Sequence, residues 1–314
     1  MNAHDLIKEA IAEKGKFDSV YWIACGGSMI DLIPAHELLQ REATTFTSYI
    51  YTAREFDIMR PHRLGEKSLV IACSHSGNTP EVVEGCEIAL AAGATVIAQT
   101  DNAGSKIDTG KWTTWPQAEV PAGISLSLAA ELLDQQEGYA DLADMYAGIA
   151  EMDKILPPAR EKVNAELGDR FAKLCQEHEF FYILGSGPNF SQTYGFAICS
   201  LMEMQWQHCS YIHSAEYFHG PFEATQDGVF YFLQMGSSEC RAMDERALAF
   251  LKTHTDTLMV LDAKEYGMEA VPASVRAYLD PVLFYAMNCE LRAARGRVFD
   301  HDPDFRRYMG VVEY

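Results

Sequence analysis

The sequence carries little positive charge and has no long apolar run. Its 314 residues include 25 Lys and Arg against 45 Asp and Glu, which gives a formal net charge of −20. Nucleic-acid binding needs clustered basic side chains, so we expect no nucleic-acid partner. A membrane-spanning helix needs about 20 consecutive apolar residues, so we expect no membrane association either.

Paired cysteines and metal-ligand spacings are also missing. The eight cysteines are scattered singly, without a CxxC pair, and His208, His213 and His219 are spaced five and six apart, which does not fit zinc. Gly185-Ser186-Gly187 is too short a signal for a dinucleotide site. Residues 1–10 read as an amphipathic helix rather than a secretory signal. We therefore expect a cytoplasmic protein that uses no metal and no cofactor.

Apolar strand-like runs alternate with helical segments in two similar halves. This alternation predicts an α/β fold in which parallel sheets are covered on both faces. Each half has too few strands for a barrel, so we expect two doubly wound lobes that form a tandem pseudo-repeat, with boundaries at 1–140 and 141–314. The predicted strands lie at 20–25, 47–51, 69–73, 94–99, 180–184, 210–212, 229–233 and 258–261.

Two helical segments, about 125–136 and 141–176, are expected to join the halves. The adjacent prolines Pro157 and Pro158 fall inside the second segment. Since proline lacks the N–H that a helix interior uses, we expect a break there. The region 141–314 then holds linking helices, the second lobe and a C-terminal tail.

A hydroxyl-rich loop at 74–79 is the most informative stretch of the chain. It follows the apolar run 69–73 and precedes Pro80, which begins a helical pattern. Helix N-terminal N–H groups and the hydroxyls of Ser74, Ser76 and Thr79 favour an anion, and Gly77 lets the backbone approach it. A bound phosphate is the natural interpretation, although an ordinary hydroxyl-capped turn would have the same local sequence.

The second half has a matching loop at 235–240, but with a different composition. Glu239 stands there where an anion would sit. We therefore expect one phosphate site per chain, in the first lobe.

Several motifs resemble the sugar isomerase (SIS) domain family of phosphosugar-binding proteins. These are Cys-Gly-Gly-Ser at 25–28 and Ser-x-Ser-Gly-x-Thr-x-Glu at 74–81, in a duplicated α/β chain. Met-Glu-Met-Gln-Trp at 202–206, His-Gly-Pro at 219–221 and the tail 306–314 resemble the fructosamine-6-phosphate deglycase branch. That branch includes the bacterial 6-phosphofructose-aspartate and fructoselysine-6-phosphate deglycases.

The resemblance implies roles for individual residues. Glu203 would be the catalytic base and His219 the acid/base for ring opening, while Gly27 and Glu216 are possible substrate contacts. It also implies a homodimer with shared active sites and a small phosphosugar as the substrate. The residues implied in phosphate binding are Ser28, Ser74, His75, Ser76 and Thr79.

The residues themselves give partial support to this chemistry. Glu203 lies in an otherwise apolar helical stretch, and partial burial adapts a carboxylate to proton transfer. His219 precedes Gly220 and Pro221, which indicates a loop. Taken singly, however, such a glutamate is more often solvent-facing or salt-bridged, and such a histidine more often structural or merely exposed.

The expected function is hydrolysis of a 6-phosphorylated fructosamine (an Amadori compound) to glucose 6-phosphate and a free amino acid. The alternatives are a phosphosugar aldose–ketose isomerase and a non-catalytic phosphosugar-binding regulator. The isomerase half of glucosamine-6-phosphate synthase has a similar layout but uses a lysine near its C-terminus. Here no lysine follows Lys264, so net synthesis of an amino sugar is not expected.

Overall fold

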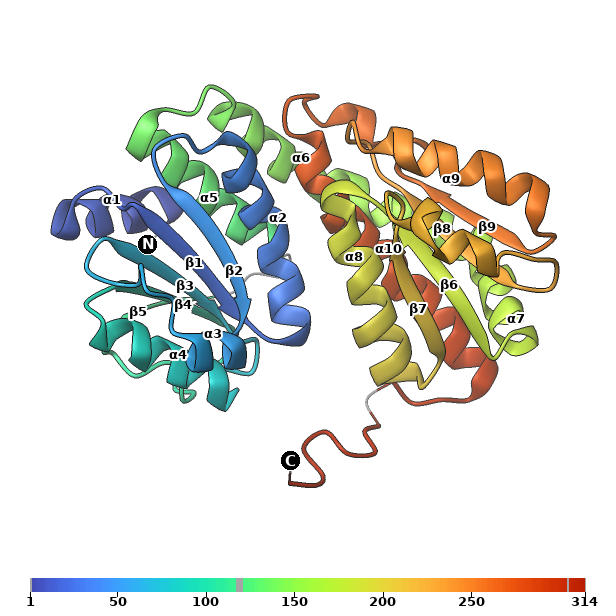
Figure 1. The fold of residues 1–314 in the computed structure, drawn as a ribbon, viewed down its shortest axis with the longest axis horizontal. Helices are drawn as coiled ribbons and strands as arrows, with labels where there is room; N and C mark the ends of the chain where they lie inside the picture. The colour runs from blue at the N-terminus through green and yellow to red at the C-terminus, as the bar shows by residue number, and fades with distance from the viewer. Residues whose placement is uncertain (1, 117–120, 304, 314) are drawn as a thin grey trace. The chain divides into compact units, whose positions relative to one another are not determined.

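The computed structural model describes residues 2–116, 121–303 and 305–313, and the chain divides into two compact units. The first unit is Met1–Tyr146 and the second is Ala147–Tyr314 (Figure 1). Each unit contains one parallel sheet, and together they confirm the predicted α/β class.

The first unit has a five-stranded parallel sheet in the order β2-β1-β3-β4-β5. Every residue of β1 and β3 is buried, as expected for central strands covered on both faces. Its elements are α1 (Ala3–Lys14), β1 (Ser19–Ala24), α2 (Gly26–Glu42), β2 (Thr47–Thr52), α3 (Ala53–Met59), β3 (Ser68–Cys73), α4 (Pro80–Ala91), β4 (Thr95–Thr100), β5 (Thr113–Pro116) and α5 (Pro121–Glu137).

The second unit has a four-stranded parallel sheet in the order β7-β6-β8-β9. The order repeats that of the first four strands of the first unit, so the predicted duplication is visible in the topology. Its strands are β6 (Phe180–Gly185), β7 (His208–His213), β8 (Phe230–Met235) and β9 (Leu258–Asp262). Its α-helices are α6 (Leu142–Val163), which begins in the first unit, α7 (Asp169–Glu177), α8 (Phe190–Gly195), α9 (Arg241–His254) and α10 (Arg276–Phe299).

Shorter helical turns complete the second unit. Two segments have π-helical hydrogen bonding, Asn164–Gly168 between α6 and α7, and Phe196–Glu203 after α8. Short 3₁₀ turns occur at Gly187–Asn189, Tyr217–His219, Pro221–Ala224, Ala263–Glu265 and Met268–Ala270.

The expected helix break at Pro157 and Pro158 is wrong, because α6 runs through both residues. A proline costs a helix one hydrogen bond and a clash with the preceding turn. The buried side chains of Met152, Ile155 and Val163 flank the two prolines, and this packing offsets the loss.

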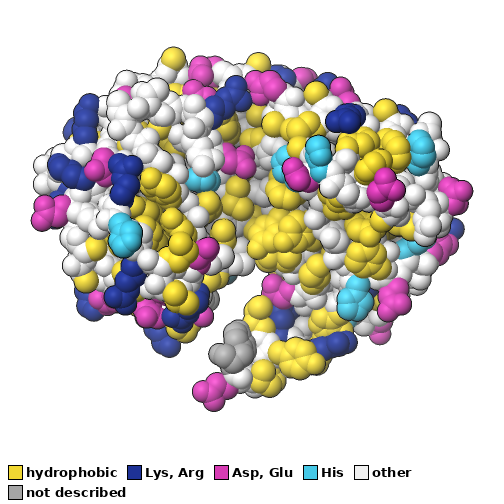
Figure 2. Space-filling model, in the orientation of Figure 1, with side chains coloured by type: hydrophobic (Ala, Val, Ile, Leu, Met, Phe, Trp, Pro, Cys, Tyr) yellow, Lys and Arg dark blue, Asp and Glu magenta, His cyan; other side chains and the backbone are white. Residues whose placement is uncertain are grey.

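The sequence analysis did not anticipate α3, β5 or the long helix α10. Beyond α10, the tail has hydrophobic residues that are each between 50% and 67% exposed (Figure 2). These are Phe305, Tyr308, Met309, Val311 and Val312. Within the described ranges, no helix is long and apolar enough to cross a membrane.

Candidate functional site

The loop at 74–79 connects the C-terminal end of β3 to the N-terminus of α4, as predicted. In this strand order the connections after β1 and β3 leave the sheet in opposite directions, and ligands bind at such a switch point. Ala24 and Cys73 are register partners at the ends of these two strands. The loops that follow them, with Ser28 and Ser74, therefore start side by side.

A hydrogen bond joins the two loops. The His75 N–H donates to Ser28 Oγ at 3.1 Å. Ser28 lies in the first turn of α2, whose leading N–H groups have no partner within the helix. A Cβ added at Gly26 or Gly27 would meet nothing within 4 Å, so the backbone here borders open space.

The hydroxyls of the loop form an ordered set. Ser74, which is 1% exposed, lies 3.0 Å from Thr79 between the two side-chain oxygens. The Asn78 N–H donates to Ser76 Oγ at 3.2 Å. Thr79 occupies the N-cap of α4 and Pro80 its first position, so the helix begins directly at the loop. This arrangement presents hydroxyls and a helix N-terminus to one region.

Gly77 is required by the shape of the loop. Its φ is +66°, and a Cβ there would lie 1.9 Å from Ser105 Oγ. Its carbonyl accepts from the Ile107 N–H at 2.9 Å, which ties the loop to the segment after β4. The tight turn therefore depends on glycine in two ways, through conformation and through space.

Two ionisable side chains flank the loop. The His75 imidazole Nδ1 lies 3.1 Å from Asp101 Oδ2, with 73% of the His75 side chain exposed. Asp31 follows Ser28 by one helical turn, and burial raises the pKa of its carboxyl to about 8. A carboxyl with a raised pKa repels a nearby anion less than an ordinary aspartate does, and the sequence analysis did not single out Asp31.

The matching loop of the second unit is occupied by the protein's own carboxylate. Asp280, in the first turns of α10 and 0% exposed, accepts from the Ser237 N–H at 2.5 Å and from Ser237 Oγ at 2.8 Å. Glu239, expected to fill this position, is instead an exposed residue. Asp280, 41 residues after Glu239, thus supplies the carboxylate at the second loop. A contact over this separation could not be predicted from the local sequence.

Substituting Asp280→Asn is expected to change how stability depends on pH. Burial raises the pKa of Asp280 from 3.8 to about 7, against hydrogen bonds from Ser237 and the charges of Arg276 and Arg241. The folded state holds this proton more tightly than the unfolded state, so the contribution is full below pH 3.8 and is lost as pH rises through about 7. Urea unfolding from about pH 5 to about pH 8 should show wild type losing stability relative to the variant.

The control for this experiment is Asp227→Asn, at an exposed aspartate of the same unit. Its unfolding midpoints should run parallel to those of wild type across the series. Parallel curves for Asp280→Asn as well would mean that Asp280 does not titrate differently on folding.

Glu203 ends the π-helical segment Phe196–Glu203, and 24% of its side chain is exposed. The Arg306 Nε donates to Glu203 Oε1 at 3.2 Å, from the C-terminal tail. The prediction of partial burial is therefore confirmed, while the arginine partner was not foreseen, because it lies 103 residues away in the sequence.

His219 ends the 3₁₀ turn Tyr217–His219 and is exposed, as is Glu216 at the start of that turn. Glu203 and His219 lie at opposite ends of β7, since Glu203 precedes the strand and His219 follows it. A strand of six residues spans roughly 17–20 Å. One chain does not bring these two side chains together.

Helix α10 supports this separation independently. Its residue Arg295 donates to Gln205 Oε1 at 3.0 Å, close to Glu203, whereas Asp280 contacts the loop after β8. The 15 residues between Asp280 and Arg295 correspond to about 22 Å of helix. The end of the sheet that carries Glu203 is therefore distinct from the end from which His219 emerges.

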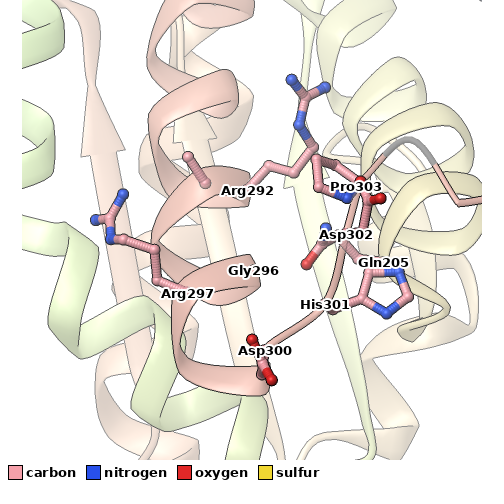
Figure 3. A pocket seen from close by; sticks show the side chains of 9 residues that line it. Gln205, Arg292, Gly296, Arg297, Asp300, His301, Asp302 and Pro303 are labelled. Carbon is pink, nitrogen blue, oxygen red and sulfur yellow. The ribbon is translucent and has the colours of Figure 1, made fainter.

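A cavity of about 450 Å³ lies between the C-terminal end of α10 and the start of the tail (Figure 3). Its lining mixes positive and negative side chains and includes none of the predicted site residues. The residues are Gln205, Arg292, Ala293, Gly296, Arg297, Asp300, His301, Asp302 and Pro303. Within the part of the chain that the structure describes, no three His, Cys, Asp or Glu side chains converge as metal ligands.

Comparison with known proteins gives one family match and several relatives. The SIS domain model matches residues 18–126. Fructosamine deglycase FrlB of Bacillus subtilis (strain 168) is 36% identical over 313 residues, which cover 96% of this chain and 94% of that protein. Fructoselysine 6-phosphate deglycase of Escherichia coli (strain K12) is 30% identical over 322 residues, covering 99% and 91%.

A solved structure is also similar to this chain over nearly its full length. A phosphosugar-isomerase-like protein from Bacillus subtilis superposes with a TM-score of 0.90 and 34% identity. The match covers 99% of this chain and 98% of that one. The similarity therefore extends over both units and is not confined to the first.

Proposed function

Because the chain belongs to the SIS-domain family of phosphosugar proteins, we propose that it is a fructosamine-6-phosphate deglycase. It would convert a 6-phosphorylated fructosamine and water to glucose 6-phosphate and a free amino acid. The observation that carries the proposal is the hydroxyl-lined loop at the β1/β3 switch point, in a chain that resembles two deglycases over nearly its full length.

In this proposal the phosphate of the substrate binds at 74–79. The hydroxyls of Ser74, Ser76 and Thr79 donate to its oxygens, and the N-terminus of α4 favours its charge. Gly27 borders open space in the first turn of α2, and the neighbouring Ser28 is joined to the loop by the hydrogen bond from the His75 N–H.

Removing a hydroxyl from this loop should weaken substrate binding while leaving the fold intact. In Thr79→Ala and Ser74→Ala, one charge-assisted hydrogen bond is lost, worth roughly 1.5–3 kcal/mol. KM for the phosphorylated substrate should therefore rise about tenfold or more in each variant. Steady-state kinetics measure this, and circular dichroism checks the fold.

Thr253→Ala, an exposed threonine in α9, serves as the matched control and should leave KM unchanged. If Thr79→Ala and Ser74→Ala also kept the wild-type KM, the phosphate would have to bind elsewhere.

The reaction needs a base next to C1. Releasing the amine requires a proton to move between C1 and C2 of the sugar, which gives an aldose imine. Water then hydrolyses the imine, and the amino acid leaves as the free amine. We assign the base to Glu203, which retains solvent access, and the ring-opening acid/base to His219, because an imidazole can both donate and accept a proton.

The proposed site requires two copies of the chain. Glu203 and His219 emerge at opposite ends of β7, so a pocket that uses both must take one from each of two subunits. We therefore propose a homodimer with shared active sites. Within the described residues the eight cysteines form no disulfide, which suits the reducing cytoplasm in which we place the reaction.

A substrate panel tests the function directly. Glucose 6-phosphate release is followed by a coupled dehydrogenase, with fructosamine 6-phosphates of Asp, Lys, Asn and Arg, and with fructose 6-phosphate. Turnover of at least one fructosamine and none of fructose 6-phosphate supports the deglycase. Turnover of fructose 6-phosphate alone would instead indicate an isomerase, and saturable binding without any turnover would indicate a regulator.

A further inference from the structure

The tail of the chain contacts the proposed base. Arg306 Nε and Glu203 Oε1 are 3.2 Å apart, and the two side chains are 22% and 24% exposed. Within the described residues, Oε1 has this one donor and Oε2 accepts no hydrogen bond. The carboxylate is thus held by one oxygen while the other stays available.

The guanidinium is itself fixed in place. Its Nη1 donates to the carbonyl of Pro303, so the planar group is anchored by the backbone on one side and reaches Glu203 on the other. Each Arg306 N–H has a defined direction, because the fork of donors is rigid.

Aromatic packing holds the surrounding tail against the same helix end. Arg307 lies over the Trp206 ring at 3.5 Å, and Trp206 packs edge-on against His301 at 4.5 Å and Phe305 at 5.5 Å. Trp206 has a φ of +52°, which is uncommon for a bulky residue and persists only where the packing enforces it. Trp206, three residues after Glu203, therefore has an uncommon backbone conformation at the position where the tail packs.

We propose that Arg306 is a positioning residue that orients the Glu203 carboxylate toward the substrate. The inference rests on the proposed function, in which Glu203 takes the proton from C1. The contact to Oε1 fixes the rotation of the carboxylate and leaves Oε2 to take the proton from C1. Small misplacements of a catalytic group can cost about 10²-fold in rate, so the contact has a large potential effect on turnover.

Arg306→Ala is expected to lower kcat about 10- to 100-fold with less than about threefold change in KM. Methylguanidinium added to this variant should restore part of the lost kcat, because it can fill the emptied position. Arg306→Lys should recover little, since an ammonium lacks the fork that joins Pro303 and Glu203. Tyr308→Ala, at an exposed residue of the same tail, is the matched control and should keep wild-type kinetics.

A double-substitution test separates this role from a purely structural one. In a Glu203→Asp background the carboxylate is one methylene shorter and beyond the reach of Arg306, so adding Arg306→Ala should cost less than about threefold. An equal cost in both backgrounds would overturn the inference, as would a kcat for Arg306→Ala within about twofold of wild type or above it.

The outcomes also separate this inference from the proposed function. If Glu203→Gln is inactive while Arg306→Ala is wild-type-like, the positioning role fails and the deglycase proposal stands. If Glu203→Gln is fully active, the positioning role and the assignment of the base to Glu203 both fail, while the deglycase function itself stands or falls with the substrate panel.

Discussion

Glu203→Gln is expected to lower turnover by about 10²- to 10⁴-fold, the usual effect of losing an acid–base group. The substitution keeps the shape of the side chain and its contact with Arg306 while removing its basicity. Because the phosphate contacts of the proposal come from other residues, those at 74–79, KM and ligand-induced thermal stabilisation should stay close to wild type. Steady-state kinetics on a fructosamine 6-phosphate measure turnover and KM. A thermal-shift assay with and without the ligand measures the stabilisation.

Glu269→Gln provides the matched control, since Glu269 is an exposed glutamate of the same unit to which the proposed site gives no role. It should keep most of its activity. If Glu203→Gln stayed within a few-fold of wild type and Glu216→Gln did not, the base would be Glu216.

Mixing two inactive variants is expected to restore activity. Glu203→Gln keeps His219, and His219→Ala keeps Glu203, so a dimer with one chain of each has one intact pair if the residues act across subunits. Random pairing of equal amounts makes half of the dimers mixed, and about one quarter of all sites are then intact. The mixture should therefore recover about a quarter of wild-type activity, from two components that are each nearly inactive.

Each variant mixed with itself and processed identically is the control. Subunit exchange is verified by native mass spectrometry. If mixed dimers form and activity stays at the level of the separate variants, the residues do not act across subunits, and the shared-site proposal falls.

The sequence predicted the parts of the fold that depend on local pattern. The apolar run at 69–73 became β3, and Pro80 marked the start of α4, because strands and helix starts reflect the residues that form them. The hydroxyl-rich loop at 74–79 could be located for the same reason. The duplication was also visible, since the strand runs recur in the same order in both halves.

The contacts that the sequence did not predict join segments that are far apart. Asp280 reaches Ser237 from 43 residues away and Arg306 reaches Glu203 from 103, and no periodicity connects such pairs. At Pro157 and Pro158 the local rule was outweighed by buried neighbours such as Met152 and Val163. Tertiary packing decides such cases, and a single sequence does not report it.

Asp280 also makes the two matching loops differ in whether a dissolved anion can bind to them. A carboxylate attached to the same polypeptide competes for the Ser237 loop at an effective concentration of millimolar or above. Dissolved phosphates or sugars at lower concentrations cannot displace it, so this half is permanently ligated by its own chain. Under the proposed function, a substrate phosphate then has the loop at 74–79 of the first unit as its binding position, and ligand-linked stabilisation starts from that loop.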